Sequence, residues 1–406
     1  MIFNARNMSS YFEVTGGNKL QGELRITGAK NAVLPMLCGA LLTTETCVFT
    51  DVPDISDVGV LLGIIEELGA EVSRDKEAKT ITITAKDIDL DYFASKEYLN
   101  EAKKIRGSVM LLGPLLARYG KAFLPKPGGD KIGRRRLDTH FHGFITLGAK
   151  FTYDEDKDEF FLEAQKLKGT YLHMEEISVT GTANVVMAAA LAEGETTIYN
   201  AACEPYLQQL CSMLQRMGAN ISGIGSNLLK ITGVKHLGGT EHRILPDMIE
   251  IGSLIGLAAM TQSSLRIKDA GIDSLGIIPH TFRKLGINLN IDNDDIIVPA
   301  QDIYEIQNFI DGSILTIYDA PWPGFTPDLL SIVLVVATQA RGSVLIHQKM
   351  FESRLFFVDK LIDMGAQIIL CDPHRATVIG LERKSQLRGI KMSSPDIRAG
   401  VSLLIA

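Results

Sequence analysis

Val58–Ala70 reads VGVLLGIIEELGA and contains one copy of the pattern on which the architecture of this chain rests. Apolar residues recur in it at helical spacing, and Gly69 follows the last of them, Leu68. A glycine in that place is the expected left-handed cap of a helix. The run Thr80–Thr84, TITIT, then alternates as a strand does. Together these residues predict a helix that ends at a glycine and leads into a strand.

The same signature, an apolar residue, a glycine and a small or apolar residue, recurs at intervals of about 70 to 80 residues. Its copies are Leu68–Ala70, Leu147–Ala149, Met217–Ala219, Leu285–Ile287 and Met364–Ala366. Self-similarity at a fixed period predicts repeated structural units.

Each unit also contains an earlier helix that is rich in small and aliphatic residues. The predicted helices of this kind are Asn31–Leu42, Ser108–Ala117, Ala183–Ala192, Ile251–Met260, Leu329–Ala337 and a sixth from Ala399 onward. Small residues let helices pack closely, so we expect buried central helices. Six helix starts and five glycine ends predict an α/β fold of six units, the last of them truncated at Ala406.

Composition narrows the class of protein. A chain of 406 residues with 46% apolar and 22% charged residues is globular and long enough for two domains, and we expect their boundary near 240–245. A net charge of −7 argues against a nucleic-acid partner. The histidines and cysteines lack metal-ligand spacing, so we expect no metal and no cofactor. Without an apolar leader or a span of membrane length, we expect a soluble cytoplasmic protein without a membrane partner.

The segment Pro125–Asp138, PKPGGDKIGRRRLD, is the most basic part of this acidic chain. Its prolines and glycines predict a loop. Five cations surround one acid, Asp130. These residues alone leave two interpretations equally open, a solvated turn and a lid that closes over an anionic ligand.

A second candidate anion site is Thr27–Ala32, TGAKNA, at the start of the first small-residue helix. A helix start presents free N–H groups and a partial positive charge, to which Lys30 adds a full charge. Asn31 could cap this helix or donate to a ligand, and a structural helix cap with an exposed lysine is an equally good interpretation of the segment. Polar residues also open the later helices: Arg106, Ser178, Asp247, Asp328, Asp396 and Arg398.

Nine segments match one known family in the same order along the chain. They are Ile26–Pro35, Arg106–Ser108, Pro127–Arg135, Leu137–Asp138, Asn200–Pro205, His242–Asp247, Phe325–Asp328, Phe351–Arg354 and Asp396–Ala399. With them the chain resembles the UDP-N-acetylglucosamine 1-carboxyvinyltransferase family, enolpyruvyl transferases of peptidoglycan synthesis. The related 5-enolpyruvylshikimate-3-phosphate synthases carry Lys-Ser where this chain has Lys30-Asn31, which favours the UDP-sugar branch.

The resemblance implies a two-lobed fold with three pseudo-symmetric units in each lobe, in an inside-out α/β arrangement. Residues 30–245 would form lobe I, with a closing loop at 125–138. Residues 1–29 and 246–406 would form lobe II, whose C-terminal end would be missing.

The resemblance also implies the reaction. The enolpyruvyl group of phosphoenolpyruvate would pass to the 3-hydroxyl of UDP-N-acetylglucosamine and release phosphate, the first committed step of peptidoglycan synthesis. Lys30, Arg135 and Arg398 would hold phosphoenolpyruvate, and Asn31 would contact the ligands between the lobes. Asp328 would be the base, or the group that orients the substrate, at the sugar 3-hydroxyl.

Asp130 would be the proton donor, at a position where many members of the family have cysteine. An aspartic acid is ionised at neutral pH unless it is shielded from water, so loop closure would have to desolvate it. The residues that would line the UDP-sugar site are Arg106, Arg135, Arg136, Leu137, Asp138, Thr139, Ser178, Val179 and Met350. The alternatives are a shikimate-pathway enzyme and a non-catalytic UDP-sugar-binding paralogue.

Overall fold

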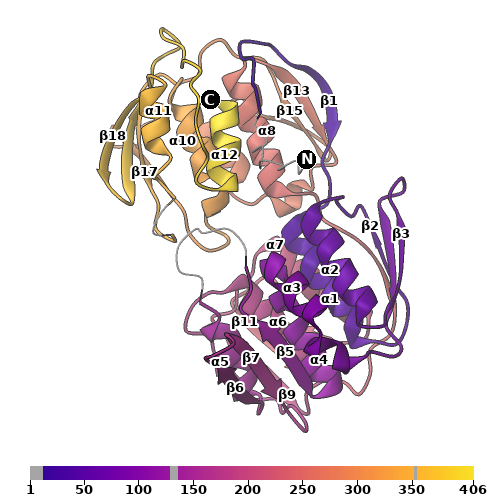
Figure 1. The fold of residues 1–406 in the computed structure, drawn as a ribbon. Helices are drawn as coiled ribbons and strands as arrows, with labels where there is room; N and C mark the ends of the chain where they lie inside the picture. Colours follow the sequence, from indigo (N-terminus) through magenta and orange to yellow (C-terminus); the bar gives the residue numbers. More distant parts are fainter. Residues whose placement is uncertain (1–11, 129–135, 352–353) are drawn as a thin grey trace, which may run out of the picture.

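The computed structural model describes residues 12–128, 136–351 and 354–406. These residues form a mixed α/β structure with five small sheets (Figure 1). They divide into two hydrophobic cores. The first core contains buried residues from Ala29 to Ile244. The second contains Ile26 and buried residues from Met248 to Ile405.

Three sheets belong to the first core. They are, in strand order, β12 (Thr240–Arg243), β2 (Cys47–Thr50), β4 (Thr80–Thr84) and β3 (Glu71–Asp75); β5 (Lys121–Pro125), β7 (Glu159–Glu163) and β6 (Lys150–Asp154); and β10 (Asn220–Ser222), β11 (Leu228–Thr232), β9 (Glu195–Tyr199) and β8 (Tyr171–His173). Two sheets belong to the second core. They are β1 (Gln21–Arg25), β13 (Ser264–Lys268), β15 (Asp295–Val298) and β14 (Asn290–Asp292); and β16 (Leu315–Tyr318), β17 (Ser343–His347), β19 (Arg375–Ile379) and β18 (Gln367–Asp372).

The helices lie among these sheets. Those of the first core are α1 (Lys30–Gly39), α2 (Ser56–Glu67), α3 (Lys96–Lys104), α4 (Leu112–Tyr119), α5 (Asp138–Thr146), α6 (Val179–Ala189) and α7 (Pro205–Arg216). Those of the second core are α8 (Met248–Met260), α9 (Ile278–Lys284), α10 (Leu330–Ala337), α11 (Val358–Asp363) and α12 (Ile397–Ile405). Short 3-10 helices are η1 (Ala40–Leu42), η2 (Leu90–Ala94), η3 (Arg106–Leu111), η4 (Ile272–Ser274) and η5 (Pro327–Leu329).

The glycine signature is confirmed at every copy. Gly69, Gly148, Gly218, Gly286 and Gly365 have φ between 88° and 105°, a backbone conformation that favours glycine. Each follows the last turn of a helix, and the chain then turns toward the next strand. The predicted helix and strand pairs therefore form because the helix can end sharply at these positions.

The small-residue helices are buried in the centres of the cores, as predicted. In the second core, α8, α10 and α12 lie between the two sheets (Figure 1). A Cβ atom at Gly252 of α8 would lie 2.4 Å from the side chain of Leu329, and one at Gly256 would lie 2.4 Å from that of Ile332. The glycines on α8 therefore let α10 approach more closely than any larger side chain would allow.

The chain crosses between the two cores twice, at residues 26–29 and 244–247, and the two crossings pair with each other. Gly28 and Pro246 form an antiparallel bridge. The Ala29 N–H donates to the Leu245 carbonyl at 2.7 Å, and the Asp247 N–H donates to the Thr27 carbonyl at 3.0 Å. The Gly28 N–H also donates to the Asp51 carbonyl at 3.1 Å. The backbone groups of the crossings are therefore satisfied by each other and by the first core.

A side chain of the first core, that of Gln209, also forms hydrogen bonds to the backbone at the second crossing. Gln209 of α7 donates to the Arg243 carbonyl at 2.8 Å and accepts from the Leu245 N–H at 3.1 Å. Tyr206, on the same helix, packs against both cores. Helix α7 is therefore one of the elements of the first core that meet the second.

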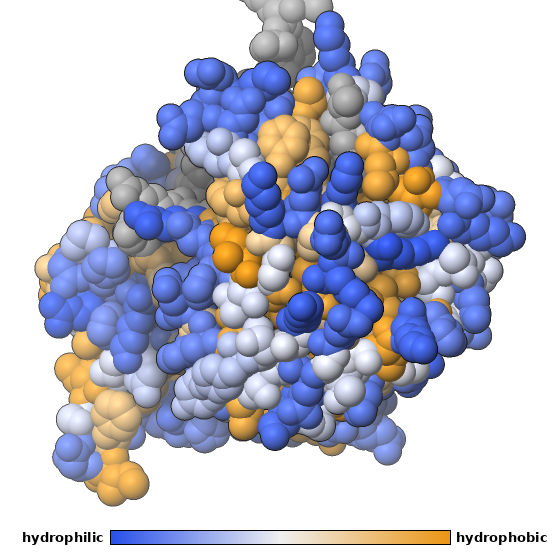
Figure 2. Space-filling view, turned by 90° about the horizontal axis from the view of Figure 1, so that it is seen from below, coloured by the Kyte–Doolittle hydropathy of each residue, from blue (hydrophilic) through white to orange (hydrophobic). Residues whose placement is uncertain are grey.

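The face of the first core that is seen from below in Figure 2 is mainly hydrophilic, with hydrophobic residues in small scattered patches. Within the described residues, every helix is too short or too polar to cross a membrane.

Gly28→Ala should destabilise the protein, because the new Cβ atom would lie 2.2 Å from the Asp51 carbonyl oxygen and 2.8 Å from Ile244. We expect a loss of ~1–3 kcal/mol, seen as a lower thermal midpoint in calorimetry. The matched control is Gly59→Ala on α2, where a Cβ meets nothing within 4 Å. That change should be neutral or stabilise by up to ~1 kcal/mol. Equal midpoints for the two variants would contradict the packing of the crossing.

Candidate active site

Asp328 is the centre of a charged cluster in the second core. It lies in η5, and its N–H donates to the hydroxyl of Thr326, which caps the helix start. One carboxylate oxygen accepts from Arg354 at 2.6 Å, and the other lies 3.0 Å from Arg398. Both oxygens of Asp328 are thus held by guanidinium groups from two later segments of the chain. Charge-assisted contacts of this kind fix the orientation of the carboxylate.

Arg354 is the more buried of the two arginines, with a side chain that is 9% exposed. Its guanidinium lies 4.5 Å from the centre of the Phe351 ring. Its Nε is buried and has no hydrogen-bond partner among the described residues. Arg354 lies in one of the segments that match the family, and no role was predicted for it. Arg354 and Asp328 are 26 residues apart in the chain, so no local pattern indicates their ion pair. Only the match of the Arg354 segment to the family could have indicated it.

Arg398 comes from the start of α12. Asp396 caps this helix by accepting from the N–H groups of Arg398 at 2.7 Å and Ala399 at 3.0 Å. The hydroxyl of Ser331, at the start of α10, donates to the Arg398 carbonyl at 3.4 Å. Two helix starts that were predicted as polar positions therefore meet at one place.

Lys30 is the first residue of α1, as predicted, and its ammonium group lies 2.5 Å from Asp57 of α2. Its side chain is 45% exposed. The residue before the helix is Ala29, and no side chain caps this end. The interpretation of Asn31 as the cap of α1 is therefore wrong.

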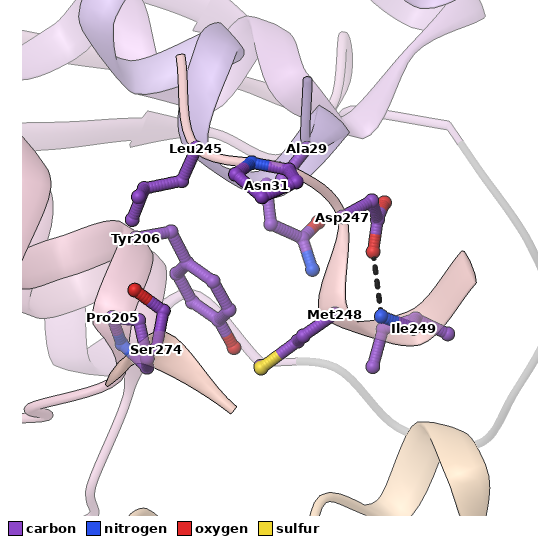
Figure 3. A pocket seen from close by; sticks show the side chains of 10 residues that line it. Ala29, Asn31, Pro205, Tyr206, Leu245, Asp247, Met248, Ile249 and Ser274 are labelled. Atoms are coloured by element: carbon purple, nitrogen blue, oxygen red, sulfur yellow. Dashed lines mark hydrogen bonds between the residues drawn. The ribbon is translucent and has the colours of Figure 1, made fainter. Parts of the chain in front are cut away.

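Asn31 instead lines a small cavity beside the two crossings, together with Tyr206, Asp247 and Met248. Figure 3 shows the side chains of Asn31, Tyr206 and Met248 directed toward this space. Asp247 caps α8 by accepting from the Ile249 N–H at 2.8 Å. The cavity thus combines the first turn of α1 with the first turn of α8.

Electrostatics connects this cavity to the Asp328 cluster. Burial raises the pKa of Asp247, while Arg398 acts to lower it and Asp328 to raise it. Burial also raises the pKa of Tyr206 well above its usual value, and Glu204, Asp328 and Asp247 add to that rise. Charges act on each other over short distances in a protein, so these groups share one neighbourhood.

A groove of about 630 Å³ lies on the first core. It brings together four of the residues predicted for the UDP-sugar: Arg106, Arg136, Leu137 and Asp138. Arg106 also donates to the Arg136 carbonyl at 3.5 Å. The rest of the lining is aromatic and apolar, with a few polar groups: Lys126, Pro127, Phe141, His142, Ile145, Phe151, Tyr153, Phe160 and Glu175. Basic groups beside aromatic rings can bind an anion that carries a flat ring.

Three other predicted residues lie at the starts of α5 and α6. Thr139 donates to Glu176 at 3.0 Å. Ser178 caps α6 by accepting from the Gly181 N–H at 3.2 Å, and Val179 is the first residue of that helix. They are not among the residues that line the groove.

Met350 lies exposed at the surface beside the second core, and its N–H donates to the buried carboxylate of Asp319 at 3.2 Å. Asp319 also accepts from the Lys349 N–H at 2.5 Å. These two hydrogen bonds from the Lys349–Met350 backbone to Asp319 were not predicted, because no local sequence pattern connects the segments that contain them. Asp130 and Arg135 lie outside the described residues. Among the residues that the structure does describe, no group of three or more His, Cys, Asp or Glu side chains could hold a metal ion.

Comparisons with known proteins agree with this architecture. Residues 14–406 match the family model of EPSP synthase (3-phosphoshikimate 1-carboxyvinyltransferase). The UDP-N-acetylglucosamine 1-carboxyvinyltransferase of Bacteroides thetaiotaomicron is 61% identical over 395 residues, which cover 97% of this chain and 91% of that protein. The protein of the same name from Porphyromonas gingivalis is 59% identical over 399 residues, covering 98% and 92%.

Solved structures show the same fold at low identity. The enolpyruvyl transferase NikO from Streptomyces tendae aligns with a TM-score of 0.81 at 20% identity, over 96% of this chain and 88% of that one. An EPSP synthase from Acinetobacter baumannii aligns with a TM-score of 0.69 at 17% identity, over 95% and 89%. The chain therefore has the enolpyruvyl transferase fold and belongs to the EPSP synthase family of carboxyvinyltransferases.

Proposed function

We propose that this chain transfers the enolpyruvyl group of phosphoenolpyruvate to the 3-hydroxyl of UDP-N-acetylglucosamine and releases phosphate, as a step of peptidoglycan precursor synthesis. The observation that carries this choice of acceptor is the 61% identity over 97% of the chain to a UDP-N-acetylglucosamine 1-carboxyvinyltransferase. The family model bears the name of the shikimate enzyme, so shikimate 3-phosphate is the acceptor to test against it.

The transfer needs a base, an acid and cations. The sugar oxygen forms a bond to C2 of phosphoenolpyruvate as the base takes its proton and the acid protonates C3. A proton then leaves C3 while the C2–O bond to phosphate breaks, which gives the enol ether and inorganic phosphate. In our proposal Asp328 is the base and Asp130 the acid. Lys30, Arg135 and Arg398 hold the phosphate and carboxylate groups.

The geometry of Asp328 supports its role. Its side chain is 19% exposed, and its carboxylate is oriented by Arg354 and Arg398. A base with a fixed orientation abstracts a proton efficiently only from a substrate held in reach. We propose that this contact lies near the cavity with Asn31 and Asp247, because Asp328 acts on the pKa of Asp247 although it does not line the cavity itself.

The groove on the first core is the site that we propose for the nucleotide part of the acceptor. Arg106 and Arg136 supply the charges that a diphosphate requires. The aromatic residues supply a flat apolar surface on which the nucleobase can pack. Met350 would meet the acceptor from the second core.

The finer architecture also belongs to this proposal. We propose that the two cores are the two lobes of the fold, each built from three pseudo-symmetric units with helices inside and sheets outside. The sixth unit would begin at α12. The cytoplasmic location and the absence of a cofactor stay predictions from the sequence.

Phosphate release tests the acceptor. The purified chain should release phosphate from phosphoenolpyruvate with UDP-N-acetylglucosamine and not with shikimate 3-phosphate. Asp328→Asn should lower kcat ~10²–10⁴-fold, because the amide cannot take the hydroxyl proton. Asp302→Asn, at an exposed acid elsewhere in the second core, is the matched control and should keep full activity. Turnover of shikimate 3-phosphate alone would refute the proposed acceptor, and unchanged activity of Asp328→Asn would refute the base.

Arg354→Met should reduce kcat ~10–100-fold, because it frees one oxygen of Asp328 from its 2.6 Å contact and lets the carboxylate reorient. Arg341→Met is the control, since Arg341 is 48% exposed and pairs with Glu305 and Glu382 at the surface. Steady-state kinetics of both variants, with calorimetry to confirm folding, checks this. A loss of the same size in both variants would contradict the orienting role.

The aspartate at position 130, which lies outside the described residues, predicts that the protein resists fosfomycin. Fosfomycin alkylates the cysteine that many members of the family carry there, and a carboxylate is a poor target for it. We expect the wild-type chain to keep its activity after incubation with fosfomycin and Asp130→Cys to lose it, with a covalent adduct at position 130 in mass spectrometry. An adduct on the wild-type loop would overturn this prediction.

A further inference from the structure

Asn184 is a fully buried amide in α6 whose hydrogen-bonding groups all have partners. Its carbonyl oxygen accepts from the Gly113 N–H at 2.8 Å. Its NH₂ group donates to the Val109 carbonyl at 2.9 Å and faces Nδ1 of His140 at 2.8 Å. One side chain thus connects η3, α4, α5 and α6.

These contacts settle the protonation of His140. Because the Asn184 nitrogen can only donate, Nδ1 of His140 must accept, and the ring proton lies on Nε2. Nε2 faces the Thr180 hydroxyl at 3.1 Å and donates to it. Burial, with a contribution from Arg106, lowers the pKa of His140 to about 3, which agrees with a neutral ring. We call Asn184, His140 and Thr180 the amide network.

The amide network ties together the three segments that supply the proposed acceptor site on the first core. Val109 belongs to η3, which begins at Arg106. His140 is the third residue of α5, directly after Asp138 and Thr139. Thr180 lies in the first turn of α6, next to Ser178 and Val179.

Close packing leaves these helices little freedom to adjust without the network. A Cβ atom at Gly113 of α4 would lie 2.6 Å from the backbone carbonyl oxygen of Asn184 and 2.8 Å from its side-chain amide oxygen. One at Gly143 of α5 would lie 2.3 Å from the Val185 side chain. Helix α6 is therefore clasped between α4 and α5, and its rotation and shift along its own axis are set by directional hydrogen bonds.

We propose that Asn184, acting through His140, is a positioning residue for the sugar nucleotide, because it holds the three segments at the spacing that the acceptor requires. This inference rests on the proposed function. Neither side chain touches the acceptor in this account. The effect passes through Arg106, through Asp138 and Thr139, and through Ser178 and Val179.

An apolar replacement of Asn184 tests whether its directional hydrogen bonds are needed for binding of the acceptor. Asn184→Leu fills a similar volume and removes the three hydrogen bonds. We expect the KM for UDP-N-acetylglucosamine to rise ~10-fold or more, since small displacements of binding groups have large effects. The KM for phosphoenolpyruvate should stay within ~2-fold, because Lys30 and Arg398, the two of its proposed ligands that the structure describes, have their contacts elsewhere. A purely structural role would change both constants together or neither.

His140 allows a rescue experiment. His140→Leu removes both ring contacts and should raise the acceptor KM like Asn184→Leu. In His140→Asn, the amide oxygen takes the place of Nδ1 and can still accept from Asn184, so the acceptor KM should stay within ~3-fold of wild type. Thr180→Val removes only the hydrogen bond between His140 Nε2 and the Thr180 hydroxyl. It provides a third variant for measuring the acceptor KM if an Asn184 variant fails to fold.

A destabilised control separates positioning from loss of stability. Ile83→Ala truncates a fully buried side chain of β4, in a different sheet of the first core. It should lower the thermal midpoint as much as Asn184→Leu and leave the acceptor KM unchanged. Titration calorimetry with UDP-N-acetylglucosamine alone should reproduce the ranking of the variants.

The outcomes distinguish this inference from the proposed function. Wild-type turnover of UDP-N-acetylglucosamine decides the function by itself. If wild type turns it over and Asn184→Leu and His140→Leu both keep a wild-type acceptor KM, the inference is wrong and the function stands. If His140→Asn is as impaired as His140→Leu, the contact to Asn184 is not the one that positions the site.

Discussion

The pairing of the two chain crossings is the constraint around which this molecule is arranged. Residues 26–29 and 244–247 run antiparallel, and each satisfies backbone groups of the other. Lys30 directly follows the first crossing, and the cap residue Asp247 is the last residue of the second. The same backbone contact that joins the cores therefore sets the starts of α1 and α8 side by side. Both helix starts then face the cavity that contains Asn31.

Charged groups of the candidate active site lie where helices begin. Asp328, Arg398 and Asp247 all lie within the first turns of helices or cap them, and they influence one another electrostatically. The interiors of the same helices are small and apolar, which lets them pack into the centre of each core. Chemistry and packing are thus separated along each helix, and one type of element serves both.

The sequence predicted the parts of this structure that local rules govern. A glycine at 69 or 365 is recognisable because a helix end needs a positive φ, and the helices fall within a few residues of their predicted ranges. The pairing of Arg354 with Asp328 and the contact of Asn184 with Gly113 join residues far apart in the chain. No periodicity encodes such contacts.

Other site assignments came from resemblance to a family and not from local rules. Asn31 shows the difference between the two kinds of evidence. Helix-start chemistry suggested a cap, whereas the packing of the crossings directs its side chain into a cavity. The roles of Asp130 and Arg135 still rest on resemblance alone.

The parallel pairing of β1 with β13 has a consequence for how the chain folds as it is made. Gln21 pairs with Ser264, so the partner of β1 is synthesised about 240 residues later. At about 5–20 residues per second, β1 waits on the order of 10 s or longer outside the ribosome. The buried residues of the first core are complete by Ile244, before β13 exists. During that interval β1 is an unpaired strand edge that chaperones or other nascent chains can reach.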